Sequence, residues 1–183
     1  MREKLDEERI LRAFRRLSEL LKERGVQGEL CILGGTVMVL CFKQRADTKD
    51  VDAIFWPAPT IRELAEVVRQ EQDLPQGWLN DSAKGYVSRR HEVVAGDLPQ
   101  FENLRLLAPA PEYMLAMKCM ASRIAPQTES QGDVADIRFL ARHLGLKTPE
   151  EVLRIVAAYY PEERIPPRAR FLIEDIFAET GPP

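Results

Sequence analysis

The sequence has little of what would place a protein in a membrane or outside the cell. No apolar stretch approaches the roughly 18 residues that a membrane-spanning helix needs, and the charged N-terminus MREKLDEERI does not resemble a secretion signal. The three cysteines are odd in number, and none stands in a CxxC pair or at another metal-ligand spacing. These absences predict a soluble, cytoplasmic protein with no membrane partner, in which Cys31, Cys41 and Cys119 are buried free thiols.

An excess of positive charge is also missing. The 26 Lys and Arg residues face 29 Asp and Glu residues, so the formal net charge is −3. The chain as a whole is therefore not expected to bind polyanions, and any contact with nucleic acid needs a local basic patch. The run KGYVSRR over residues 84–90 is one such patch. It predicts either a charged edge strand that resists aggregation or an RNA contact in which Tyr86 stacks on a base.

What the sequence does contain is enough apolar residues for a core and a clear order of elements. Strands and helices alternate over residues 1–108, and helices alone follow over residues 109–183. This order predicts an α/β (α+β) fold, with a mixed β-sheet flanked by helices and a helical C-terminal part packed on that core. Trp56 and Trp78 are expected to be packing residues.

Hydrophobic periodicity and turn residues place the individual elements. A capping box is expected at Thr60 and Glu63. Residues 72–85 are expected to form a loop, and residues 126–131 a polar connection. Strands are predicted at 29–33, 50–56, 86–95 and 104–107, and helices at 4–24, 36–42, 61–71, 111–124, 132–144, 149–160 and 167–178.

The segment LGGTVMVLCFKQRADTKDVDAIF, residues 33–55, is the most informative about function. Gly34 and Gly35 stand at a strand-to-helix junction, where glycine lets backbone N–H groups approach a ligand closely. The N-terminus of the following helix offers N–H donors to an anion such as a triphosphate. Thr36 adds a hydroxyl donor there or caps the helix. A dinucleotide-binding turn fits less well, because GGTVMV is not GxGxxG.

Two carboxylates follow at the start of the next strand. Residues i and i+2 of a strand point to the same face, so Asp50 and Asp52 project together while Val51 and Ala53 turn toward the core. Neighbouring carboxylates repel each other unless a cation neutralises them, and their hard oxygens suit Mg²⁺ together with substrate phosphates. The alternative is an acidic strand start on a solvated edge, beside an unrelated glycine turn.

This combination resembles the core signature of the DNA polymerase β-type nucleotidyltransferase superfamily, in which a Gly-Gly/Ser turn precedes a DxD strand. In style it is closer to the abortive-infection and toxin–antitoxin nucleotidyltransferases, which carry Arg-x-[Ser/Thr]-x-Asp-[Ile/Leu/Val]-Asp. Residues 45–52 follow that pattern with one extra residue before Thr48. Downstream, Glu112 replaces the usual Asp ahead of Lys118, and GDVADIRFL supplies Asp133 and Asp136. The resemblance covers residues 28–142.

The resemblance implies a role for each matching position. Asp50 and Asp52 would bind the catalytic Mg²⁺, and residues 34–36 would hold the nucleotide phosphates. Lys118 would neutralise phosphate charge, and Asp136 would lie near the same pocket. For Lys118 the alternative is a solvated helix lysine, and for Asp133 it is a simple helix cap.

Superfamily members also use a third carboxylate, often as the base for the acceptor hydroxyl. Glu92 is the best candidate, on the predicted strand over residues 86–95. Asp81 and Asp97 are rivals, although both stand in turn-like contexts where Asp is common.

The implied function is Mg²⁺-dependent transfer of a nucleotide from an NTP to an acceptor. That acceptor is an RNA such as tRNA, or a protein, and the chain would be the toxin of a toxin–antitoxin pair with an antitoxin as partner. One alternative is a catalytically degenerate module that binds a nucleotide or a partner. Another is transfer to a cationic small molecule held by acids such as Glu92, Asp97 and Glu102.

Overall fold

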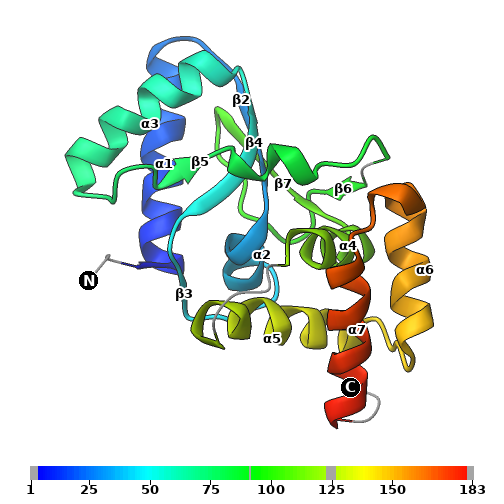
Figure 1. The fold of residues 1–183 in the computed structure, drawn as a ribbon. Helices are drawn as coiled ribbons and strands as arrows, with labels where there is room; N and C mark the ends of the chain where they lie inside the picture. Colours follow the sequence, from blue (N-terminus) through cyan, green and yellow to red (C-terminus); the bar gives the residue numbers. More distant parts are fainter. Residues whose placement is uncertain (1–3, 91, 123–126, 181–183) are drawn as a thin grey trace. The chain divides into compact units, whose positions relative to one another are not determined.

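The computed structural model describes residues 4–90, 92–122 and 127–180. Within these residues, seven α-helices accompany a five-stranded mixed sheet and a two-stranded sheet, which confirms the predicted mixed α/β class (Figure 1). The chain forms two compact units. A sheet unit comprises Met1–Gly85 and Val93–Ala108, and a helical unit comprises Tyr86–Glu92 and Pro109–Pro183. Among the described residues, no helix combines the length and the apolar character needed to cross a membrane.

The five-stranded sheet has the order β5 (Leu79–Asn80), β4 (Val51–Trp56), β2 (Gly28–Ile32), β7 (Leu104–Pro109) and β6 (Val93–Val94). Strand β4 runs antiparallel to β2, whereas β7 is parallel to β2 and β5 is parallel to β4. The core face of β4 follows the predicted alternation, because Val51 and Ala53 are both fully buried. This alternation leaves the intervening Asp52 on the opposite face.

The first helix of the sheet unit begins later than predicted. Helix α1 spans Glu7–Glu23, and its N-cap Asp6 accepts a hydrogen bond from the backbone N–H of Arg9 at 2.9 Å. Leu5 and Asp6 form strand β1, which pairs with β3 (Asp47–Thr48) in the two-stranded sheet. This pairing ties the start of the chain to the segment that leads into β4.

The third helix of this unit, α3 (Ala58–Gln72), follows α2 (Gly34–Leu40) and contacts α1. It begins before Thr60, with Pro57 as N-cap and a proline in the first turn, where the missing N–H of proline costs nothing. The predicted capping box is therefore wrong. Glu63 instead pairs with Arg24 at 2.6 Å.

The region between α3 and β7 also differs from the prediction. The expected loop over residues 72–85 contains strand β5 and the 3₁₀ helix η1 (Ser82–Tyr86). The strand predicted over residues 86–95 is reduced to Val93 and Val94, because residues before it bond to the helical unit instead.

The helical unit contains α4 (Pro111–Ala121), α5 (Gln127–His143), α6 (Pro149–Tyr159), the 3₁₀ helix η2 (Glu162–Arg164) and α7 (Pro167–Thr180). Helix α4 contacts α5, α6 and α7, and its residues from Tyr113 to Met120 are buried. The expected polar connection over residues 126–131 falls inside α5 from residue 127 onward, while residue 126 lies outside the described residues. The predicted end of the first of these helices, at residue 124, also lies outside them.

The cysteines and tryptophans separate into buried and exposed positions. Cys119 is buried, whereas Cys31 is half-buried and Cys41 is exposed, so the prediction of three buried thiols holds only for Cys119. Trp78 is buried, and its indole N–H donates to a backbone carbonyl at 2.9 Å. Trp56 is 70% exposed because it ends β4 on the face opposite Val51, which contradicts its predicted packing role.

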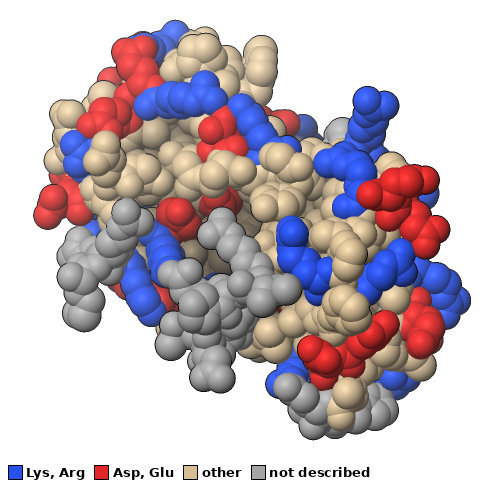
Figure 2. All heavy atoms as spheres, in the orientation of Figure 1, with Lys and Arg blue, Asp and Glu red and all other residues tan. Residues whose placement is uncertain are grey.

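The surface carries both signs of charge. Figure 2 shows Lys and Arg side chains interspersed with Asp and Glu side chains over the face drawn. This distribution fits the small net charge of −3 and places any anion-binding function in a local cluster.

Candidate functional site

Asp50 and Asp52 converge on a small polar cluster at the junction of β4 and β5. The Asn80 amide Nδ2 donates to Asp50 Oδ2 at 3.3 Å, and the Ser82 hydroxyl donates to Asp52 Oδ1 at 3.0 Å. The same hydroxyl also contacts Asn80 Oδ1. These four residues, Asp50, Asp52, Asn80 and Ser82, are called the aspartate cluster below. Both carboxylates are half-buried, with Asp52 on β4 and Asp50 immediately before that strand.

The carboxylate of Asp52 lies directly against the glycine turn. Gly34 begins helix α2 (Gly34–Leu40) with φ +59°, and a Cβ at this position would be 3.0 Å from Asp52 Oδ2. Both the left-handed backbone and the close approach require glycine here. The backbone N–H of Leu33 donates to the Asp52 carbonyl at 2.8 Å, which fixes the turn against the strand.

The other two residues of the turn brace the segment that carries the carboxylates. A Cβ on Gly35 would lie 2.5 Å from Thr48 Oγ1, so glycine is needed there for packing against β3. Thr36 is fully buried, and its hydroxyl donates to the Asp50 carbonyl at 3.3 Å. The side chain of Thr36 therefore positions Asp50, and a contact of residues 34–36 with phosphate would come from their backbone.

Sequence reasoning missed Asn80 and Ser82. Strand β5 pairs in parallel with β4 and places Asn80 opposite Asp52, which brings the two polar side chains to the carboxylates. A two-residue strand is too short to show a period. The only available signal was the apolar pair Trp78-Leu79 immediately before Asn80.

The carboxylate of the neighbouring Asp81 forms ion pairs with basic side chains of the protein. Its carboxylate pairs with Arg62 at 2.5 Å and with Lys84. The hydrogen bond from Lys84, followed by the one from Arg62, lowers the pKa of Asp81. Asp52, by contrast, forms no ion pair with any Lys, Arg or His among the described residues, and its side chain is held by the neutral hydroxyl of Ser82. The Asp52 charge is thus held in place without being neutralised by a described residue.

A third carboxylate does not join this pair within the part of the chain that the structure describes. No group of three or more His, Cys, Asp and Glu side chains with a geometry fit for a metal occurs among those residues. Asp97 is exposed. Glu92 does not lie on a strand, which corrects the sequence prediction, because β6 begins only at Val93. Its carboxylate accepts a hydrogen bond from the Tyr159 hydroxyl at 3.1 Å, within the helical unit.

Lys118 and its two acidic neighbours form a second charged cluster, inside the helical unit. The ammonium group of Lys118 lies 2.6 Å from Asp136 Oδ2 and 3.0 Å from Asp133 Oδ1. Lys118 is 8% exposed and Asp136 is 3% exposed, so Lys118 is not a solvated helix lysine. Asp133 lies well inside α5 and does not cap it, because that helix begins at residue 127. Glu112, in contrast, is exposed.

Comparison of the chain with known protein families, with curated proteins and with solved structures finds no match. The functional proposal therefore depends on the residues of the aspartate cluster and on their chemistry.

Proposed function

We propose that this chain is a Mg²⁺-dependent nucleotidyltransferase that moves a nucleotide from an NTP to an acceptor. The acceptor is an RNA such as tRNA, or a protein, and the activity suits the toxin of a toxin–antitoxin pair. One observation carries the proposal. Two half-buried carboxylates are held side by side by Asn80 and Ser82, and one of them lies against a side-chain-free turn at Gly34.

The residues present fit Mg²⁺. This ion prefers hard oxygen ligands, and it commonly binds through one or two carboxylates while substrate phosphates and water complete its shell. Asp50 and Asp52 would supply the carboxylates, and the hydrogen bonds from Asn80 and Ser82 keep both oriented before the ion arrives. The bound ion supplies charge stabilisation of a phosphoryl group during in-line displacement.

The turn and its support have complementary roles. Because Gly34 has no side chain, the Asp52 carboxylate lies directly against the turn, so an ion bound to Asp52 would be close to residues 34–36. The Thr36 hydroxyl donates a hydrogen bond to the backbone carbonyl of Asp50, and this bond restricts the movement of the carboxylate pair. Positioning of this kind is the main contribution that a protein makes to phosphoryl and nucleotidyl transfer.

Label transfer tests the proposal. The full chain is incubated with Mg²⁺, with each α-labelled NTP in turn, and with total RNA and protein from a cell extract. We expect label to enter RNA or protein, and Asp50→Asn and Asp52→Asn to reduce the rate by on the order of a hundredfold or more, since metal-ion catalysis supplies several kcal/mol. Asp97→Asn, which changes an exposed acid of the same unit, is the matched control. Equal labelling by wild type and Asp52→Asn would refute the proposal.

A second candidate is a non-catalytic module that binds a nucleotide or a partner protein through the same site. It is favoured by the absence, among the described residues, of a third carboxylate to act as base. Calorimetric titration with Mg²⁺ and NTP separates the two candidates. Binding that depends on Asp52 without any label transfer identifies the module, and transfer identifies the enzyme.

A further inference from the structure

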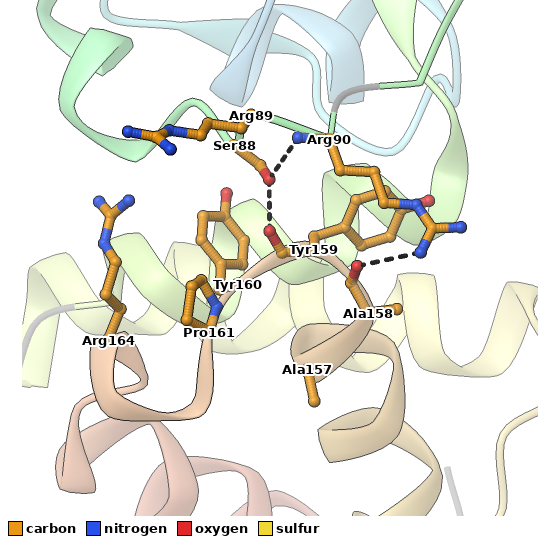
Figure 3. Close-up of a pocket in the computed structure, with 9 residues that line it drawn as sticks. All are labelled: Ser88, Arg89, Arg90, Ala157, Ala158, Tyr159, Tyr160, Pro161 and Arg164. Atoms are coloured by element: carbon orange, nitrogen blue, oxygen red, sulfur yellow. Dashed lines mark hydrogen bonds between the residues drawn. The ribbon is translucent and has the colours of Figure 1, made fainter.

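The helical unit contains a pocket of about 490 Å³ at the C-terminal end of α6. Three of its lining residues are arginines: Arg89, Arg90 and Arg164. No Asp or Glu lines it, so the lining has a formal charge of +3 in a chain whose net charge is −3. Figure 3 shows the guanidinium groups of Arg89 and Arg164 on one side of the Tyr160 ring, with Arg90 on the other side.

The first two arginines are carried by a segment that is firmly anchored. We call residues Tyr86–Arg90 the strap. Its Ser88 donates its backbone N–H to the Tyr113 hydroxyl at 2.9 Å and its own hydroxyl to the Tyr159 carbonyl. The Tyr160 hydroxyl donates to the strap carbonyl of Tyr86. Because these bonds hold the strap against α4 and α6, the backbone of Arg89 and Arg90 is fixed at the rim of the pocket.

Helix capping explains only part of this positive charge. The Arg90 side chain donates to the Ala158 carbonyl at 3.5 Å, which is the arrangement expected of a cation at a helix C-terminus. Arg89 and Arg164 make no ion pair with any described residue, although nearby acids exist. Glu162, two residues before Arg164, pairs with Arg170 at 3.0 Å instead. Two exposed guanidinium groups thus flank one pocket without a carboxylate to balance them.

We propose that this pocket binds the phosphate groups of a single-stranded RNA. Guanidinium groups bind phosphate oxygens through two parallel N–H donors, and two such groups on one side of a pocket suit the successive phosphates of a strand. Two other lining residues, Ala157 and Pro161, are exposed and contribute carbon surface against which a base can rest. A peptide carrying only carboxylates would leave that surface unused.

The proposal that the pocket binds RNA depends only on the residues that line the pocket. That the bound RNA is also the acceptor of nucleotide transfer rests on the proposed function. The strap also accounts for the basic run over residues 84–90. It is not an edge strand, and two of its arginines line the pocket.

Fluorescence anisotropy with a short labelled polyuridylate tests the proposal. The full chain carries Arg89→Gln together with Arg164→Gln, and both residues are exposed, so the fold should be retained. We expect affinity to fall by about tenfold or more, the effect of losing a charge-assisted hydrogen bond. The slope of log affinity against log salt should become shallower by roughly 1.4, since each phosphate contact with a single strand contributes about 0.7.

The matched control removes the same charge from the same unit, outside the pocket, as Arg142→Gln with Arg154→Gln, two exposed residues. It should bind RNA within about twofold of wild type. The proposal is overturned if this control loses as much affinity as the pocket variant, which would indicate a diffuse charge effect. It is also overturned if polyglutamate displaces the RNA as well as unlabelled polyuridylate does, because the pocket would then select carboxylate peptides equally.

The same variants distinguish a failure of this inference from a failure of the proposed function. If Asp52→Asn labels normally while the pocket variant loses RNA, the nucleotidyltransferase proposal fails and the RNA site stands. If label transfer depends on Asp52 but RNA affinity is unchanged when Arg89 and Arg164 are replaced, only the proposal of the RNA site is refuted.

Discussion

Replacing Asp52 by asparagine removes one of two neighbouring negative charges and keeps the size of the side chain. The asparagine Oδ1 can still accept the hydrogen bond that Ser82 gives to Asp52 at 3.0 Å. The change therefore isolates charge from packing. Alternate residues of an extended chain lie about 7 Å apart, and two unit charges at that separation repel by ~0.6 kcal/mol in water and by ~2.4 kcal/mol at an effective permittivity of about 20. Because Asp50 and Asp52 are only half-buried, we expect a repulsion of ~1 kcal/mol, in the lower part of this range.

The predicted result is a gain in stability without metal and a loss of the response to metal. In EDTA, Asp52→Asn should unfold at a temperature about 2–4 °C above wild type, the shift that ~1 kcal/mol produces in a chain of this length. Adding Mg²⁺ at about 100 times its dissociation constant should stabilise the wild-type protein by ~2.7 kcal/mol. The variant should gain little, because one of two ligands has lost its charge.

Differential scanning calorimetry in EDTA and in a Mg²⁺ series measures both effects, with Asp97→Asn as the exposed control. The control should match wild type in each condition. The reasoning fails if Asp52→Asn melts below wild type in EDTA and still gains as much from Mg²⁺ as wild type does. The Asp52 charge would then have a structural role within the fold.

Three further perturbations give distinct outcomes. Gly34→Ala should lower the free energy of unfolding by ~1–2 kcal/mol in urea, because alanine strains a backbone with φ +59° and its Cβ would lie 3.0 Å from Asp52 Oδ2. Lys118→Ala should cost ~3–5 kcal/mol in the same assay, because it removes the ammonium group that lies 2.6 Å from the carboxylate of Asp136, which is 3% exposed. The pKa of Cys119 is raised by burial to about 12 from 9.0, so the unfolded chain releases this proton first and stability falls as pH rises between these values. Cys119→Ala should reduce the steepness of that fall in urea melts recorded across the range.

The parts of the fold that the sequence predicted well are those with a local cause. Strand β4 was placed to within a residue because its buried positions alternate with period two, as Val51 and Ala53 do. The same geometry places Asp52 on the face opposite Val51 and Ala53. The predicted helix over residues 149–160 also agrees closely with α6, whose start is fixed locally by a capping box of Thr148 and Glu151.

The parts that were missed depend on partners far away in the chain. Ser88 bonds to the Tyr159 carbonyl, 71 residues later, and no local pattern encodes that contact. The alternation of residues 86–95 predicted a strand, but tertiary bonds to the helical unit override it over most of the range. Asn80 is a similar case. Its distance from Asp50 in sequence is 30 residues, and only the pairing of β5 with β4 brings the two side chains together.

The contrast between three acids of this chain gives the strongest argument for an external cation. Asp81 is neutralised by Arg62 and Lys84, and Asp136 is neutralised by Lys118. Asp52 stands among side chains that fix its position, yet within the described residues no basic group forms an ion pair with it. A carboxylate that a fold uses only for stability gains most from a cation of the protein itself, as the other two acids do. Asp52 is repelled by the neighbouring charge of Asp50, and no ion pair with a described residue offsets this repulsion. The arrangement is explained most simply if a cation that binds together with the substrate neutralises Asp52.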